Sequence, residues 1–225
     1  MSLELKKIFI VLVPRQKKVR ARITQHLKNL TPHLRPVKQD DIHATLFSFS
    51  YLSSIPKFKK KLVNLAKNIV SILQYYSRFY SSDLYERDYH LFNDIKDTPR
   101  HFTLTFKSNP KYPKIWQKIR KDIKANIIGT LLDIDNLHLY EMEEKEINGN
   151  AHLYFTRKST GITELIIHFH NFFKPHITIG KIKEETHVSR LVKDTKKVNQ
   201  RIRWKLSPQD TLEIWNQDIS FDLKV

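Results

Sequence analysis

The length, charge and composition of the chain limit the class of protein that it can be. Its 225 residues are enough for one large domain or two small ones with a buried core. Forty Lys and Arg residues against 23 Asp and Glu leave a formal net charge of +17, which favours a polyanionic partner, most simply a nucleic acid. A hydrophobic content of 40% with 11% aromatic residues excludes a disordered basic tail.

The absence of cysteine and the scarcity of glycine exclude further classes. Without Cys the chain has no disulfide, no thiolate zinc or iron–sulfur site and no thiol nucleophile. Four scattered glycines cannot form a P-loop or a dinucleotide-binding fingerprint. The apolar run from Ile8 to Val13 is too short for a signal peptide or a membrane span. We therefore expect a soluble intracellular protein with no membrane association.

The apolar pattern of the first half predicts alternating strands and helices. In chain order, the expected elements are a strand over 8–13, a helix over 19–30, a strand over 42–49 and a helix over 56–76. Pro14 and Pro32 mark the ends of the first two. Short strands are then expected over 78–84, 89–92 and 101–106, followed by a helix over 112–127.

The second half contains one segment with a different composition. Residues 141–146 are acidic in a basic chain, which indicates an exposed insertion within 124–168. Strands over 137–142 and 151–156 could form a hairpin there, because Asn148-Gly149 is a strong turn pair. The remaining expected elements are a strand over 176–182, a helix over 186–195, and strands over 211–215 and 219–223. Consecutive strands mixed with helices predict an α+β fold with antiparallel sheet, as one domain over 1–225.

A His-x-Thr-apolar motif recurs in the chain. His43-Ala44-Thr45-Leu46 and His176-Ile177-Thr178-Ile179 both lie on expected strands and open apolar runs. A third copy is His101-Phe102-Thr103-Leu104. Eleven His and 14 Thr residues in a chain of this composition give about 0.2 matches by chance, so three copies are an excess.

Strand alternation suggests a chemical use for the motif. Residues i and i+2 of a strand project to the same face, so the His and Thr of each motif lie side by side. Two such strands placed together would direct two imidazoles and two hydroxyls at one point. One imidazole can act as a base while the other acts as an acid, and Thr hydroxyls can donate to a phosphoryl oxygen. Transesterification at an RNA phosphodiester needs these groups and no metal.

These motifs resemble those of the 2H phosphoesterase superfamily, which is defined by two His-x-[Ser/Thr]-apolar motifs on pseudo-symmetric halves. Within it, the order of segments is most similar to the U6 small nuclear RNA phosphodiesterase family. The likeness runs from the opening strand and helix through both motifs to the closing hairpin, and includes Thr98-Pro99-Arg100-His101-Phe102 before a strand and helix. The resemblance implies a bilobal fold, with two lobes of antiparallel sheet plus helices around a central groove.

The same resemblance implies an activity and a set of site residues. The activity is metal-independent 3′→5′ exonucleolytic trimming of the oligouridine 3′ end of U6 small nuclear RNA. It leaves a 2′,3′-cyclic phosphate, which some members then open to a terminal phosphate. His43 and His176 would be the acid/base pair, with His176 preferred as the base, and Thr45 and Thr178 would hold the phosphate. The resemblance further implies a nuclear enzyme without cofactor or metal, which we expect to be a monomer.

An aromatic-rich segment precedes the second motif. His170 stands at the place where the family has a base-stacking Tyr, and Phe172 and Phe173 lie nearby. An aromatic side chain here could stack on a base and contribute about 1–3 kcal/mol. These three residues are therefore candidates for substrate binding, while buried core positions are the other interpretation of the two phenylalanines.

Three alternatives remain open on the sequence. His101, rather than His43, could be the partner of His176. The chain could be a 2′,3′-cyclic nucleotide phosphodiesterase of the RNA- or tRNA-ligation type, which opens cyclic ends but does not shorten RNA. It could also be a non-catalytic basic RNA-binding domain.

Overall fold

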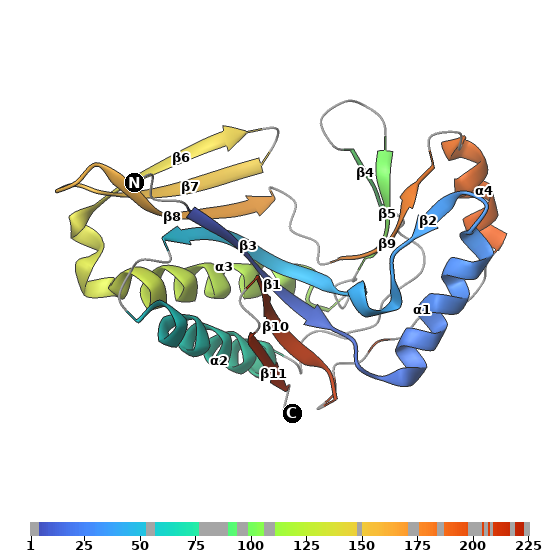
Figure 1. The fold of residues 1–225 in the computed structure, drawn as a ribbon, viewed down its shortest axis with the longest axis horizontal. Helices are drawn as coiled ribbons and strands as arrows, with labels where there is room; N and C mark the ends of the chain where they lie inside the picture. Colours follow the sequence, from blue (N-terminus) through green and yellow to red (C-terminus); the bar gives the residue numbers. More distant parts are fainter. Residues whose placement is uncertain are drawn as a thin grey trace.

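A computed structural model shows a mixed α+β fold around a large antiparallel sheet (Figure 1). The residues that it describes are 5–52, 57–76, 90–93, 99–105, 111–147, 150–170, 176–183, 187–197, 204, 207, 209–216 and 219–222.

Four α-helices and three short helical turns are assigned within these ranges. The helices are α1 (Lys17–Leu30), α2 (Phe58–Tyr76), α3 (Ile115–Ile128) and α4 (Val188–Lys197). The turns are η1 (Gln39–Asp41), η2 (Gly129–Asp133) and η3 (Ile134–Leu139). The strands are β1 (Leu5–Val13), β2 (Leu34–Pro36), β3 (Ala44–Leu52), β4 (His90–Asn93), β5 (Pro99–Thr105), β6 (Tyr140–Ile147), β7 (Asn150–Arg157), β8 (Ile162–His170), β9 (His176–Ile182), β10 (Thr211–Trp215) and β11 (Ile219–Asp222).

The strands form two rows that meet at one point. The main row has the order β11-β10-β1-β3-β8-β7-β6. The side row runs β4-β5-β9-β2 and joins the main row where Ala44 of β3 pairs with Ile177 of β9. In Figure 1, α2 and α3 lie along one face of the main row, whereas α1 and α4 flank β2 and β9 of the side row.

The rows diverge along one edge of β3. This edge pairs with β9 at Ala44 and with β8 from Ser48 onwards, where Ser48 lies opposite His168. Four positions of β3 separate these two contacts, but nine positions separate the matching residues on the other chain segment, His168 and Ile177. One edge of β3 therefore pairs with a strand of each row.

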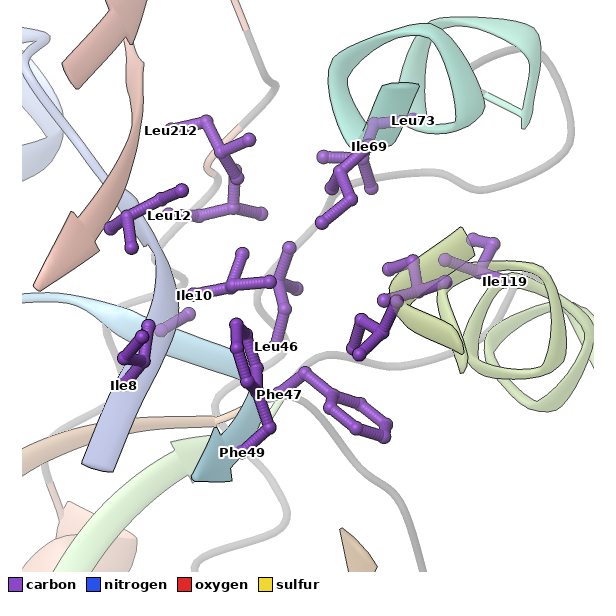
Figure 2. Packing of buried hydrophobic residues seen from close by; sticks show 14 of the residues in the cluster. Ile8, Ile10, Leu12, Leu46, Phe47, Phe49, Ile69, Leu73, Ile119 and Leu212 are labelled. Carbon is purple, nitrogen blue, oxygen red and sulfur yellow. The ribbon is translucent and has the colours of Figure 1, made fainter. Parts of the chain in front are cut away.

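The two faces of the main row differ in chemistry because strand side chains alternate. Ile8, Ile10 and Leu12 of β1 are fully buried in the core cluster that also contains Ile69 of α2 and Ile119 of α3 (Figure 2). The opposite face, here called the open face, carries the intervening side chains. By the strand register it includes Lys7, Phe9, Thr45, Ser48, His152, His168, Glu213 and Trp215. Burial of the helix-side face fixes the register, because a one-residue slip would expose its apolar set.

Most elements agree with the sequence-based prediction. The strands over 176–182 and 211–215 are confirmed with the same bounds, and the four helices and the hairpin of β6 with β7 are confirmed within a few residues. Residues 141–146 are exposed as expected, but they form the edge strand β6. The strand predicted over 78–84 lies outside the described residues. The assignment of 1–225 as one domain with an insertion within 124–168 stays a prediction.

Three features differ from the prediction. The short strand β2 and the long strand β8 were not expected. β8 follows a tight turn in which Gly161 has a φ of +66°, a conformation that glycine adopts without strain. The strand predicted over 42–49 begins at Ala44, because the turn η1 holds the preceding residues. Among the described residues, no helix is long and apolar enough to cross a membrane.

Candidate active site

The two predicted motifs meet where β3 and β9 pair. Their second residues, Ala44 and Ile177, lie directly opposite each other in an antiparallel ladder. In such a ladder, one step along either strand is one step back along its partner. The His of each motif therefore lies opposite the Thr of the other, and the four polar positions fall on one face.

Burial separates the polar and apolar members of the motifs. The apolar members are buried, with exposures of 0% for Ala44, 1% for Leu46, 0% for Ile177 and 0% for Ile179. The polar members, His43, Thr45, His176 and Thr178, are all half-buried. The apolar side chains thus anchor the two strand ends, while two imidazoles and two hydroxyls remain accessible to a ligand.

A backbone contact determines which nitrogen of His43 can exchange a proton with a substrate. His43 Nδ1 lies 2.7 Å from the Asp41 carbonyl oxygen, which can only accept, so Nδ1–H is the donor. The turn η1, which ends at Asp41, and the extended Ile42 bring this carbonyl back toward the ring. Nε2 is therefore the nitrogen that can accept a proton from a bound ligand or donate one to it.

The pKa of His43 is lowered from its usual value of 6.5, chiefly because burial disfavours the charged ring. The hydrogen bond to the Asp41 backbone and the negative charges of Asp41 and Glu213 act in the opposite direction. Because the pKa is lowered overall, the His43 imidazole is mostly neutral at pH 7 and carries an accepting lone pair on Nε2.

The structure adds Trp215 and Glu213 of β10 to the surroundings of His43. The rings of Trp215 and His43 lie 4.0 Å apart at their centroids with a tilt of 55°. Trp215 Nε1 donates to Glu213 Oε2 at 2.9 Å. Both residues were expected on a strand, but neither was given a role from the sequence. Their i, i+2 spacing in the expected strand over 211–215 was the available signal, but it did not show that this strand lies near β3.

The third motif copy lies on β5, on the far side of β9 from β3. Thr103, which is fully buried, pairs with Thr178, and Thr105 pairs with His176. His101 pairs with Lys181 beyond an irregularity in the ladder. The structure therefore brings the His43 motif directly against the His176 motif and places His101 opposite the far end of β9.

The predicted aromatic binding residues lie mostly outside the described part of the chain. His170 is the last residue of β8 and pairs with Asn150 through the backbone, but its side chain is not among those described. Phe172 and Phe173 lie outside the described residues. Their assignment to substrate binding stays a prediction.

The open face continues from the motifs as a polar surface. Ser50 Oγ lies 3.0 Å from His168 Nε2, and His168 Nδ1 lies 3.2 Å from His152 Nδ1. Burial, with further contributions from His152 and Lys7, lowers the pKa of His168 to about 4. His168 is thus held neutral and acts as a hydrogen-bonding group beside Ser50. No group of three or more His, Asp or Glu side chains within the described ranges is arranged to hold a metal ion.

Comparison with solved structures finds a distant likeness. The chain is similar to the crystal structure of the protein TT0787 of Thermus thermophilus, with a TM-score of 0.46 and 13% sequence identity, over 97% of this chain and 98% of that one. No protein-family model and no curated protein matches the chain.

We expect His43 to titrate below 6.5 in the folded protein, because burial outweighs the nearby negative charges. Histidine ring resonances followed by NMR from pH 4 to 8 measure this directly, and a His43→Gln variant identifies the signal. A titration midpoint at or above 6.5 would contradict the described packing of the ring.

Proposed function

We propose that the chain is a 2H phosphoesterase that shortens RNA from its 3′ end. The observation that carries this proposal is the antiparallel pairing of Ala44 with Ile177, which sets the His of each motif opposite the Thr of the other. The net charge of +17 suits a polyanionic substrate. In this interpretation the main row and the side row belong to the two lobes of the 2H fold, and the RNA end enters between them.

The substrate that we propose is the oligouridine 3′ end of U6 small nuclear RNA. The support is the resemblance in segment order to the family that processes this end, together with the paired motifs and the basic charge. The corresponding expectations are a nuclear, monomeric enzyme that needs no cofactor or metal for the cleavage step. Opening of the cyclic product to a terminal phosphate is a second step that the same groups could catalyse with water.

The cleavage step needs one base, one acid and donors for the phosphate. The base removes the proton of the penultimate 2′-OH, and the 2′ oxygen forms a bond to phosphorus as the bond from phosphorus to the 5′ oxygen breaks. The acid gives its proton to that 5′ oxygen, so the terminal nucleoside leaves with a 5′-OH. Thr45 and Thr178 donate to the non-bridging oxygens, where negative charge increases in the transition state.

The lowered pKa of His43 bears on which imidazole is the base. A base must be neutral before the reaction, and the burial of His43 favours its neutral form. We therefore assign the base to His43 and the acid to His176, the reverse of the preference that the resemblance suggests.

The function is tested with oligouridine RNA labelled at either end and incubated in EDTA. We expect stepwise 3′ shortening that leaves a 2′,3′-cyclic phosphate or its ring-opened product, and no cleavage at a 2′-deoxy penultimate nucleotide. His43→Ala and His176→Ala should each lower the rate by about 10²- to 10⁴-fold, the usual contribution of acid–base catalysis. His138→Ala, which changes an exposed histidine of η3, is the matched control and should leave the rate unchanged.

Other outcomes identify the competing functions. Full-length RNA that survives, combined with opening of a preformed cyclic end, would indicate the ligation-type phosphodiesterase. Binding of RNA without either reaction would indicate a non-catalytic domain.

The acid and the base are distinguished by a substrate whose leaving 5′ oxygen is replaced by sulfur. A thiolate leaves without protonation, so this substrate should restore most of the activity of the variant that lacks the acid. We expect rescue of His176→Ala and no rescue of His43→Ala, measured as single-turnover rates. Rescue of His43→Ala alone would reverse the assignment.

A further inference from the structure

We propose that Glu213 is a positioning residue that holds the His43 imidazole in place through the indole of Trp215. This inference rests on the proposed function, since it concerns the acid/base group of that site, and it adds residues that the His-x-Thr motifs do not contain.

The contact between Trp215 and His43 spans a strand. β10 pairs with β1, and β1 pairs with β3, so β10 and β3 are not neighbours in the main row. Phe9 of β1 lies opposite Trp215 and shares its face of the sheet. The indole nevertheless reaches the His43 ring, with 4.0 Å between the centroids. A side chain as short as alanine at position 215 could not reach across β1 to make this contact.

The indole is itself held by the Glu213 carboxylate. That carboxylate accepts hydrogen bonds from Trp215 Nε1 at 2.9 Å, from Thr211 Oγ1 at 2.7 Å and from Arg15 Nη2. The Glu213 side chain is only 14% exposed. Burial alone would raise the pKa of Glu213, but these hydrogen bonds hold it below its usual value, so it stays charged at neutral pH.

The Arg15 end of the network is fixed to the fold. The Arg15 backbone N–H donates to Asp210 Oδ1 at 2.9 Å, and the fully buried Asp210 also accepts from Trp204 Nε1 at 3.0 Å. The chain before α1 is thereby tied to the start of β10. Glu213 thus receives a donor whose own backbone position is set by a buried carboxylate.

Two contacts then define the orientation of the His43 ring. The Asp41 carbonyl holds Nδ1, and the Trp215 indole packs against the ring. The ring can turn about its side-chain bonds only by losing one of them. Nε2, the remaining nitrogen, is thereby directed for proton transfer, and a displacement of about 1 Å at such an atom can cost about 10²-fold in rate.

The charged and titratable groups around His43 come from each element beside it. Asp41 of η1 and Glu213 of β10 contribute negative charge, Arg15 before α1 is bound to Glu213, and His176 of β9 belongs to the facing motif. Burial lowers the pKa of His43 and the negative charge of Glu213 raises it, so removal of that charge should lower the pKa further. The pH-dependent limb that belongs to His43 should then move to lower pH, whether His43 acts as base or acid.

Three substitutions test the inference, with the His43 ring resonance and steady-state cleavage of oligouridine as readouts. Glu213→Gln removes the charge and should move the His43 titration and the matching limb of the kcat profile to lower pH. Trp215→Ala should lower kcat by about 10- to 100-fold with little change in KM. Trp215→Phe keeps an aromatic ring without the N–H donor, and should shift the His43 ring resonances while losing less activity than Trp215→Ala.

Glu143→Gln is the matched control, since Glu143 lies on the exposed edge strand β6. It should change neither the titration nor kcat. An unmoved His43 titration and unchanged kcat in folded Glu213→Gln and Trp215→Phe proteins would overturn the inference. A rise in KM with unchanged kcat in Trp215→Ala would also overturn it, because Trp215 would then contact the substrate instead.

The inference and the proposed function fail in different ways. A wild-type protein that cleaves no RNA refutes the function. An active wild-type enzyme, combined with a Glu213→Gln variant whose His43 titration and kcat are unchanged, refutes only the positioning role.

Discussion

The candidate site depends on a single stretch of backbone pairing, the contact of β3 with β9 at Ala44 and Ile177. It joins the two rows of strands, and it sets the distance between the two His-x-Thr motifs. Because side chains alternate with a period of two, a slip of one residue would set each His opposite an apolar residue. The buried Ala44, Leu46, Ile177 and Ile179 on the other face make such a slip costly.

The main row shows the same separation of apolar side chains on one face from polar side chains on the other. Apolar residues on the helix side of the main row secure the strands, so the opposite side is free to carry His, Ser, Thr and aromatic groups. Hydrogen bonds keep these polar groups in defined states, with the His43 Nδ1–H on a carbonyl and His168 beside Ser50. The His43 and His168 rings are both held toward their neutral forms by burial, so this face presents uncharged imidazoles in a chain of net charge +17.

Local patterns predicted the parts of the site but not its surroundings. Alternation within each motif showed that His43 and Thr45 share a face, and apolar spacing located the strands and helices. The partner of β3 is far away in the chain, so only the likeness of the motifs indicated that β9 lies beside it. Trp215 was missed because its contact crosses β1, and β8 was missed because an isolated Gly161 marks its start. Such features arise from tertiary packing rather than local propensity.

The most direct test of the central idea, that the two motifs form one catalytic unit, is the single-turnover rate of the His43→Ala/His176→Ala double variant on oligouridine RNA. When two groups act together in catalysis, removing both lowers the rate little more than removing one of them. We expect the double variant to be about as slow as the slower single variant. Losses that multiply in full, or a double variant as fast as the wild type, would show that β3 and β9 do not form a shared site.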